Sequence, residues 1–242
     1  MKCRPKYLFF NLISILQPSI ILDVGSMNGD DSKRFRKMSS RAQIEAIEAN
    51  PNNFEKMKAD QNLIKNRIGL NNLLISNKET SDFYITDETE TGVGNQGSSS
   101  IRKPITNANT TKITIDAITL ENFLISKNIA PHDTVALWID VEGSGYEVLE
   151  SINKKSSQIE FLQIEAELET RWEGQRLKSD LITLCTMLNL KLICESKHDT
   201  QQDLVFINKD VYEKRYNWIR LAILITNLLG PISSRIFQLL RI

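Results

Sequence analysis

The segment Ile20-Ile21-Leu22-Asp23-Val24-Gly25-Ser26-Met27-Asn28-Gly29-Asp30 indicates the fold class of this chain. It begins as a short apolar strand, turns through two glycines, and continues into a polar segment that we expect to be helical over 30–38. A second apolar segment, 44–48, ends on Glu48. A strand, a glycine turn, a helix and a strand ending in a carboxylate form half of a nucleotide-binding unit. The glycines let the backbone approach a ligand closely, and Glu48 can accept hydrogen bonds from ribose hydroxyls.

The spacing of the glycines narrows the choice of cofactor. A dinucleotide fingerprint, Gly-x-Gly-x-x-Gly, brings a pyrophosphate to a helix N-terminus. This turn has Gly25 and Gly29, with Met27 between them, and the acids Asp23 and Asp30 would repel a pyrophosphate. S-adenosylmethionine, with its positive amino and sulfonium groups, tolerates these acids. A glycine turn alone is also compatible with a plain structural turn.

Length and composition fit one α/β domain, with or without a helical appendage. The chain has 242 residues, of which 41% are apolar and 25% charged, so it can bury a full core. Thirty basic residues balance thirty acidic ones, and we therefore expect no nucleic-acid partner. The three cysteines, Cys3, Cys185 and Cys194, lack metal-binding spacing, and their odd number argues against a disulfide framework. A reducing, cytoplasmic location is the expectation.

Strands and helices alternate over residues 20–210, which favours a doubly wound α/β domain with helices on both faces of a mostly parallel, seven-stranded sheet. The apolar run 134–141 predicts a central strand buried on both faces. The last two strands, 190–195 and 203–208, are joined by a connection too short for a crossover helix, so we expect the last strand to run antiparallel. Residues 86–109 are polar, and we interpret this long loop as a candidate lid.

Both ends of the chain are apolar. Residues 1–19 begin with basic residues and imitate a signal peptide, but no small-residue cleavage site follows, and we expect a docking helix. Residues 211–242 predict an amphipathic helical tail that Gly230-Pro231 interrupts, too short to span a bilayer. Two interpretations stay open: the tail packs on the domain or a partner, or it attaches peripherally to a membrane surface. Four arginines would aid such attachment: Arg215, Arg220, Arg235 and Arg241.

Four stretches carry a family resemblance: residues 21–30, 47–51 (Ile-Glu-Ala-Asn-Pro), 137–143 (Leu-Trp-Ile-Asp-Val-Glu-Gly) and 203–208 (Asp-Leu-Val-Phe-Ile-Asn). Residues 98–101 and 115–120 contribute to the same resemblance. Together they resemble the FkbM family of S-adenosylmethionine-dependent methyltransferases. The Ile-Asp-Val-Glu-Gly block is the most specific part, since glycine turns recur across nucleotide folds. The sequence departs from the family at Trp138 and at Gly145-Tyr146-Glu147, which leaves the substrate open.

The resemblance implies a Rossmann-like class I methyltransferase fold with S-adenosylmethionine as cofactor. It also implies O-methylation of a small molecule, and our first choice of acceptor is a sugar hydroxyl on a glycan or glycolipid. Eight residues are candidate cofactor contacts: Asp23, Gly25, Ser26, Asn28, Gly29, Asp30, Glu48 and Asn50. Asp23 would contact the methionine amino end, directly or through water, or else cap the turn. Asn50 is equally interpretable as a turn residue before Pro51.

Asp140 and Glu142 are two positions apart at the end of a buried strand, so their side chains point to the same side. The carboxyl ends of parallel strands form the ligand crevice in such sheets. The pair can position a substrate hydroxyl, act as a base or hold a divalent cation; alternatively, it binds loop amides and caps the next helix. Glu165 and Glu167 follow the next strand and could complete a metal site with Asp140. His198, between the last two strands, is a further candidate base.

Two other classes of function stay open at this point. One is a non-catalytic nucleotide-fold module in a membrane-associated assembly, which the apolar tail suggests. The intact residues Gly25, Gly29 and Glu48 argue against it. The other is an NAD-dependent oxidoreductase, which needs a third glycine that the turn lacks.

Overall fold

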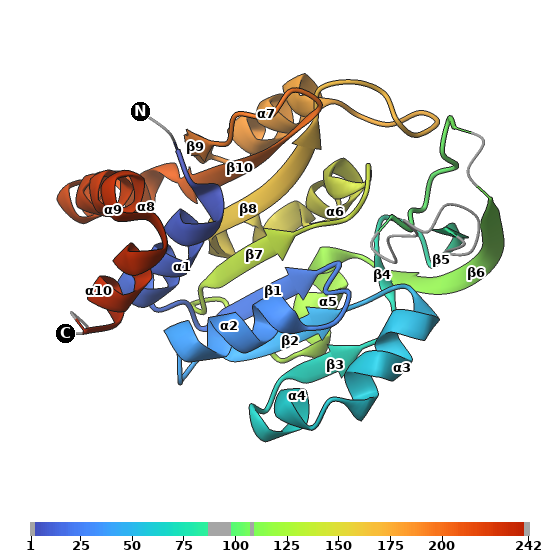
Figure 1. The fold of residues 1–242 in the computed structure, drawn as a ribbon, viewed down its shortest axis with the longest axis horizontal. Helices are drawn as coiled ribbons and strands as arrows, with labels where there is room; N and C mark the ends of the chain where they lie inside the picture. Colours follow the sequence, from blue (N-terminus) through green and yellow to red (C-terminus); the bar gives the residue numbers. More distant parts are fainter. Residues whose placement is uncertain (1–2, 87–97, 107–108, 240–242) are drawn as a thin grey trace.

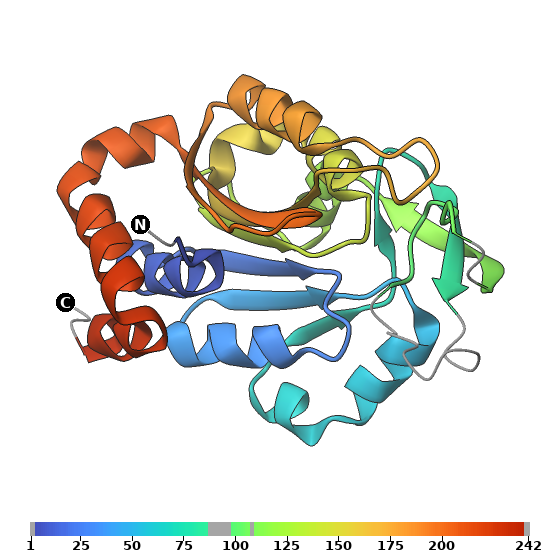
Figure 2. The same ribbon diagram turned by 45° about the horizontal axis from the view of Figure 1, so that its top comes forward.

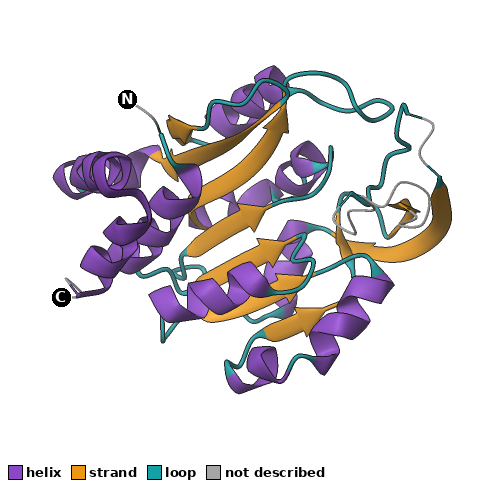
Figure 3. Ribbon diagram, in the orientation of Figure 1, coloured by secondary structure: helices purple, strands orange, loops and turns teal. Residues whose placement is uncertain are grey.

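A seven-stranded sheet forms the centre of the computed structural model, which describes residues 3–86, 98–106 and 109–239 (Figures 1 and 3). The strand order is β3-β2-β1-β7-β8-β10-β9. These strands are β1 (Ile20–Val24), β2 (Gln43–Ile47), β3 (Gly69–Asn71), β7 (Val135–Ile139), β8 (Ile159–Glu167), β9 (Leu190–Glu195) and β10 (Gln201–Asn208). The helices are α1 (Pro5–Leu16), α2 (Asp30–Met38), α3 (Pro51–Ala59), α4 (Gln61–Lys65), α5 (Leu120–Ser126), α6 (Gly145–Glu150), η1 (Asn153–Gln158), α7 (Lys178–Met187), α8 (Lys209–Lys214), α9 (Tyr216–Leu229), η2 (Gly230–Ile232) and α10 (Ser233–Leu239).

The pairing of the strands confirms the predicted sheet. β1 is parallel to β2 and β7, and β7 is parallel to β8. β10 lies between β8 and β9 and runs antiparallel to both. The short connection between β9 and β10 has no room for a crossover helix, so the chain must reverse direction there. The fold is therefore the Rossmann-like α/β arrangement expected from the sequence.

Alternating side chains of the central strands fill two cores, one on each face of the sheet. All five residues of β1 and all five of β7 are buried. Leu22 and Leu137 pack in one core, with apolar side chains of α5, α6 and α7. Ile21 and Trp138 pack in the other, with side chains of α1, α2, α9 and α10. Figure 2 shows helices on both sides of the sheet.

A second, three-stranded sheet stands beside the carboxyl ends of the main strands, and the sequence analysis did not foresee it. It consists of β4 (Leu74–Ile75), β6 (Thr110–Ile118) and β5 (Thr80–Thr86), in that order. The short segment 67–75 contains both β3 and β4, which belong to different sheets. Leu74, Phe83 and Ile115 give the small sheet its own core.

The N-terminal helix α1 joins the tail to the domain. The side-chain amide of Asn11 donates hydrogen bonds to Thr226 Oγ1 (2.7 Å) and Ser233 Oγ (2.9 Å), and all three side chains are buried. α9 ends at Leu229, and Gly230, with φ +53°, interrupts the helical run 216–239 where the sequence predicted an interruption. The expectation that the tail is too short to span a bilayer is wrong by length and composition alone, because the run 216–239 is long and apolar enough to cross one, although a third of its most apolar window is buried in the protein.

The cysteines require a second correction. Cys3 and Cys194 form a disulfide with a Cα–Cα distance of 5.9 Å, and Cys185 is free and buried. An odd number of cysteines did not exclude a single bridge. The partners are 191 positions apart in the sequence, and they meet because α1 packs beside β9 and β10. Such proximity depends on tertiary packing, which cysteine spacing does not reveal.

Candidate functional site

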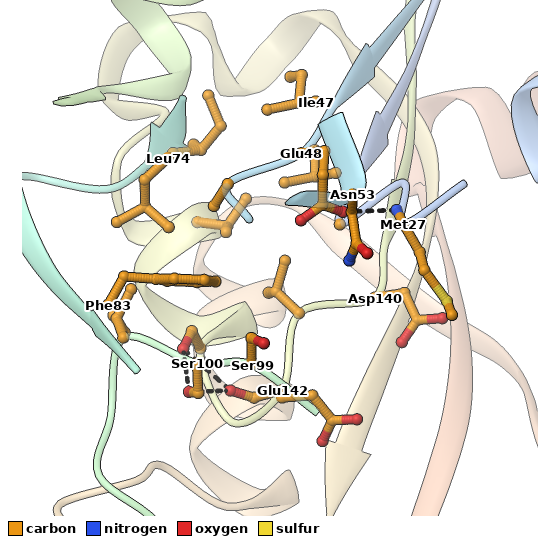
Figure 4. Close-up of a pocket in the computed structure, with 18 of the residues that line it drawn as sticks. Met27, Ile47, Glu48, Asn53, Leu74, Phe83, Ser99, Ser100, Asp140 and Glu142 are labelled. Carbon is orange, nitrogen blue, oxygen red and sulfur yellow. Dashed lines mark hydrogen bonds between the residues drawn. The ribbon is translucent and has the colours of Figure 1, made fainter. Parts of the chain in front are cut away.

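A cavity of about 280 Å³ lies where the carboxyl ends of β1, β2, β7 and β8 meet the second sheet. This volume is close to the lower end of the range for small-ligand sites, about 300–1,000 Å³. Figure 4 shows Leu74 and Phe83 on one side of the cavity and Asp140 on the other. Glu48 lies at the end of β2, beside Met27. The cavity therefore has an apolar wall facing an acidic one.

Glu48 is held in place by the backbone. Its Oε2 accepts a hydrogen bond from Met27 N (2.6 Å) and its Oε1 accepts one from Asn50 N (2.7 Å). Burial raises the pKa of Glu48 to about 7, although these two hydrogen bonds oppose the shift. Each carboxylate oxygen has a second lone pair. The Asn53 side chain is a third donor to Glu48, so one lone pair remains to accept a hydrogen bond from a ribose hydroxyl.

Neighbouring protein atoms explain why both positions of the turn are glycines. The explanation expected from the sequence was the close approach of a ligand. Gly25 has φ +85°, and a Cβ there would collide with the Asp140 carbonyl oxygen. At Gly29, with φ +73°, a Cβ would approach Leu63 Cδ2 to 2.7 Å. Gly25 lines the cavity. Its lack of a side chain lets the ends of β1 and β7 approach each other.

The remaining candidate cofactor residues of the turn stabilise the loop in this structure and do not line the cavity. Asp23 is buried and its Oδ2 accepts hydrogen bonds from Ser26 Oγ (2.8 Å) and Ser32 Oγ (2.5 Å). Burial nevertheless raises its pKa to about 7. Asn28 accepts a hydrogen bond from Asp30 N (3.0 Å), and Asp30 pairs with Lys33 (2.7 Å). The ion pair lowers the pKa of Asp30.

Asn50 also lies outside the cavity lining. It caps α3, because its Oδ1 accepts a hydrogen bond from Asn52 N (3.0 Å). Its side-chain amide also donates to Ser99 Oγ (3.3 Å), and Ser99 does line the cavity. Asn50 therefore connects the end of β2 to the segment that borders the cavity.

The acidic wall combines side chains from β7, β8 and β10. Asp140, Glu142 and Glu165 line the cavity, and Glu167 and Asp203 act on them electrostatically. Burial, followed by repulsion from neighbouring carboxylates, raises the pKa of Asp140 to about 6, of Glu142 to about 7 and of Glu165 to about 9. Solvent reaches the Asp140 side chain through the cavity, although protein atoms surround its carboxyl group. At neutral pH these neighbours therefore differ in protonation.

Three carboxylates are close enough to share a cation. Oxygen atoms of Glu142, Glu165 and Glu167 all lie within 4.8 Å of one another. Asp140, which the sequence analysis placed in such a site, does not belong to this group among the residues described. Gly143 N already donates to Glu167 Oε1 (2.8 Å), and Gln201 Nε2 donates to Glu165 Oε2 (2.7 Å).

His198 stands apart from these residues. It is exposed in the connection between β9 and β10, and its Nδ1 lies 3.4 Å from Thr200 Oγ1. It is absent from the described lining of the cavity. The structure therefore does not bring His198 together with Asp140 and Glu142.

Sequence reasoning did not single out Ser100 and Arg102, which lie in the candidate lid 86–109 and contact the turn after β7. Ser100 Oγ donates to the Glu142 carbonyl oxygen (2.6 Å), and the Ser100 backbone pairs with Tyr84. Arg102 Nε donates to Gly143 O (3.2 Å), and the Arg102 guanidinium pairs with Glu147. The polar composition of 86–109 was the available signal. Residues 87–97 and 107–108 of the candidate lid lie outside the described residues.

The sequence profile of the methyltransferase FkbM domain matches residues 23–198. The chain belongs to this family. The match covers the glycine turn, Glu48 and the acids from Asp140 to Glu167, and it confirms the resemblance seen in the sequence. FkbM domains are S-adenosylmethionine-dependent methyltransferases, so the family assignment replaces the NAD-dependent alternative.

The chain is similar to solved structures at low sequence identity. The methyltransferase FkbM from Methylobacillus flagellatus is 15% identical, with 84% of this chain covered, 48% of that chain and a TM-score of 0.48. This chain thus spans about half of that protein. A putative O-methyltransferase from Klebsiella pneumoniae is 10% identical, with 84% and 79% covered and a TM-score of 0.49. No protein with a curated description matches the sequence.

Proposed function

We propose that this FkbM methyltransferase transfers a methyl group to a hydroxyl oxygen of a small molecule or of a sugar on a glycan or glycolipid. The observation that carries the proposal is the position of Asp140. Its carboxylate is open to the same cavity that Glu48 lines, and its pKa of about 6 makes it mostly ionised at neutral pH. A base with such a pKa is suited to accept a hydroxyl proton.

The cavity residues fit S-adenosylmethionine. Glu48 would bind a ribose hydroxyl, and Ile47 and Leu74 offer apolar surface beside it. The acidic wall tolerates the positive charge of the sulfonium, which has to face the acceptor. When bound, the cofactor supplies an electrophilic methyl carbon on its sulfonium. Everything else in the reaction has to come from the acceptor and from the side chains of this chain.

The carboxyl groups of the acidic wall have different roles because they differ in protonation at neutral pH. With the cofactor bound, Asp140 would accept the proton of the acceptor hydroxyl while the oxygen bonds to the methyl carbon and the bond from that carbon to sulfur breaks, which leaves a methyl ether and S-adenosylhomocysteine. Glu165, with a pKa of about 9, keeps its proton at neutral pH and can donate a hydrogen bond. Gln201 orients it through the bond to Oε2. Proximity of the two reactants provides most of the acceleration.

A sugar suits the polar part of this cavity. Glu142, Glu165 and Gln201 place several acceptors and donors beside Asp140, and a ring with many hydroxyls can satisfy them. Ser99 and Ser100 also line the cavity, beside the backbone of Glu142. These features support a hydroxyl-rich acceptor over an amine, which would be held as a cation by the acids and would be a poor nucleophile in that form.

The test is the chemical nature of the product. The full chain is incubated with S-adenosylmethionine labelled in the methyl group and a panel of neutral mono- and oligosaccharides, and products are analysed by NMR and mass spectrometry. We expect S-adenosylhomocysteine and an O-methyl sugar in equal amounts. A product with a methyl group on nitrogen or carbon would contradict the proposal. Binding of S-adenosylhomocysteine without turnover on any acceptor would favour the non-catalytic module.

A further inference from the structure

The helices α9 and α10 have two apolar sides, and only one of them is covered. Ile219, Ala222 and Thr226 of α9 and Phe237 of α10 are buried against the domain. On the other side, the large apolar side chains are exposed. A surface helix of a soluble domain normally turns a polar face to water. The tail therefore presents an apolar face that the described protein leaves in solvent.

The exposed side chains follow one stripe along the helix. Leu221, Leu224 and Leu228 of α9 are spaced by three and four positions and are 39%, 46% and 66% exposed, and Ile232 of η2, beyond the helix end at Leu229, is 61% exposed. Such spacings place side chains on one face of a helix. Trp218 extends the stripe toward the start of α9 and is 46% exposed. We call these five residues the outer face.

The charges around the outer face indicate what it binds. The run 216–239 contains two arginines, Arg220 and Arg235, both exposed, and no acidic residue. The preceding helix α8 adds acids and bases, with the bases in excess when Arg215 is included. Arginine can lie along apolar surface while its guanidinium reaches the polar boundary. Apolar contact with positive charge at its edge is the pattern of helices that lie on anionic membranes.

We propose that the outer face binds the surface of an anionic lipid bilayer, with α9 lying in the plane of the headgroups. Tyr216 and Trp218, at the start of α9, are exposed residues of the types enriched at membrane interfaces. Arg220 donates a hydrogen bond to the Tyr216 hydroxyl (2.9 Å) and lies over its ring, so charge and aromatic surface are held together.

The covered side of the helices determines that they lie on the bilayer and do not cross it. Asn11 binds Thr226 and Ser233 inside the protein, and Ile219 and Ala222 are fully buried. Withdrawing α9 into a membrane would expose these groups of α1 and of the core. Contact through the outer face leaves them in place. The tail is then a peripheral anchor fixed to the domain.

Binding of a membrane to the outer face would not obstruct the cavity. In both views α9 and α10 lie at one end of the long axis, and the second sheet, which borders the cavity, lies at the other (Figures 1 and 2). A chain bound to a bilayer through the outer face would keep the cavity open to water. This inference is independent of the acceptor proposed above, since no residue is shared between the two sites.

Flotation of the full chain with lipid vesicles tests the proposal. Vesicles of phosphatidylcholine alone are compared with vesicles that also contain phosphatidylglycerol, each at low and high salt. We expect binding to the anionic vesicles that weakens with salt. Trp138 and Trp172 are only 4% and 6% exposed, so a blue shift of tryptophan emission on binding reports Trp218, and Trp218→Phe should abolish it.

Substitutions locate the contact. The double variant Leu228→Asp, Ile232→Asp should bind the anionic vesicles about tenfold or more weakly, because the buried apolar area decreases and negative charge is added. The matched control is Ile64→Asp, Met187→Asp, which alters side chains 53% and 78% exposed on α4 and α7; it should bind like the wild type. Both variants change exposed positions, and equal thermal unfolding temperatures would confirm that they fold.

Three results would overturn the proposal. One is no binding of the wild type to either vesicle. Another is equal binding by wild type, double variant and control. The third is a dimer in light scattering that Leu228→Asp, Ile232→Asp dissociates while no vesicle binding occurs, which would assign the outer face to a second copy of this chain. Cofactor binding is measured on the same samples, so failure of the membrane proposal stays separate from failure of the proposed reaction.

Discussion

The two halves of the cavity rim hold their carboxylates differently. At the ends of β1 and β2, Glu48 accepts a backbone hydrogen bond on each oxygen, and Asp23 accepts two hydroxyls. At the ends of β7 and β8, Asp140, Glu142 and Glu165 repel one another and other acids nearby. Burial raises the pKa on both halves. Hydrogen bonds oppose this shift at Glu48 and Asp23, whereas repulsion from neighbouring acids is the largest contribution after burial at Asp140, Glu142 and Glu165.

This difference separates a fixed half from a reactive half. A carboxylate whose orientation the backbone determines is suited to recognising an invariant ligand, such as the ribose of a cofactor. Carboxylates that differ in pKa and face a cavity are suited to exchanging protons with a substrate. We therefore assign cofactor binding to the Glu48 half and acceptor chemistry to the Asp140 half.

The largest effect is expected from Asp140→Asn. The amide keeps the shape of the side chain but cannot take a proton, so methyl transfer should fall about 10²-fold or more. The measurement is methyl transfer to an acceptor identified with labelled cofactor. Near-wild-type turnover in both Asp140→Asn and Glu142→Gln would show that these two side chains have a structural role and no catalytic one.

The pH dependence of the wild type gives an independent view of the same residue. A base must be deprotonated to act, so kcat/KM should rise with pH through about 6, the pKa of Asp140. For Asp140→Asn, the remaining kcat/KM should no longer rise with pH around 6. An unchanged rise would assign the titration to another group.

Gly25→Ala should affect both halves together, because this residue lies at the contact between them. Its φ of +85° and the Asp140 carbonyl beside it leave no space for a Cβ. The strain should lower the free energy of unfolding by about 1–3 kcal/mol, and the displaced carbonyl should weaken cofactor binding and turnover. The measurements are urea unfolding and calorimetry. Wild-type stability would show that the two strand ends are not tightly coupled.

Glu165→Gln tests the repulsion on the reactive half. A carboxyl group with a folded-state pKa of about 9, against an ordinary value of 4.5, binds its proton more tightly when folded. The stability of the folded protein therefore declines as pH rises through this window. The variant should raise the unfolding temperature at pH 8 by a few degrees and leave it unchanged at pH 4.

A divalent cation is the alternative partner for this cluster. If Glu142, Glu165 and Glu167 hold one, Mg²⁺ should raise the unfolding temperature of the wild type at pH 8 more than that of Glu165→Gln, and EDTA should abolish methyl transfer until Mg²⁺ restores it. Equal unfolding temperatures with and without Mg²⁺ would show that the three carboxylates bind no Mg²⁺. Protonation alone would then relieve the repulsion among them.

The sequence predicted those parts of the fold that follow from local pattern. The apolar runs around Leu22 and Leu137, the glycine turn and the short β9–β10 connection were sufficient for the main sheet and its antiparallel strand. The second sheet was missed because β4 has two residues and its partner β6 and the edge strand β5 have exposed positions. Phe83 and Leu74, which form the apolar wall, were missed with it.

For the site, the sequence located the strand ends but not the direction of each side chain. Glu48 and Asp140 reach the cavity, whereas Asp23 turns to the hydroxyls of Ser26 and Ser32. Which acid faces a cavity depends on partners supplied by other elements. The Cys3–Cys194 bridge and the Ser100 contact to Glu142 also depend on tertiary packing, so spacing in the sequence could not indicate them.

The most direct test of the division between the two halves is calorimetric titration of S-adenosylhomocysteine, with NAD as the control ligand, into wild type, Glu48→Ala and Asp140→Asn. We predict that the wild type binds S-adenosylhomocysteine and not NAD. Glu48→Ala should lose about 1–3 kcal/mol of binding free energy, the range for charge-assisted hydrogen bonds, and Asp140→Asn should bind almost as the wild type does. Unchanged affinity in Glu48→Ala, or an equal loss in both variants, would contradict the account.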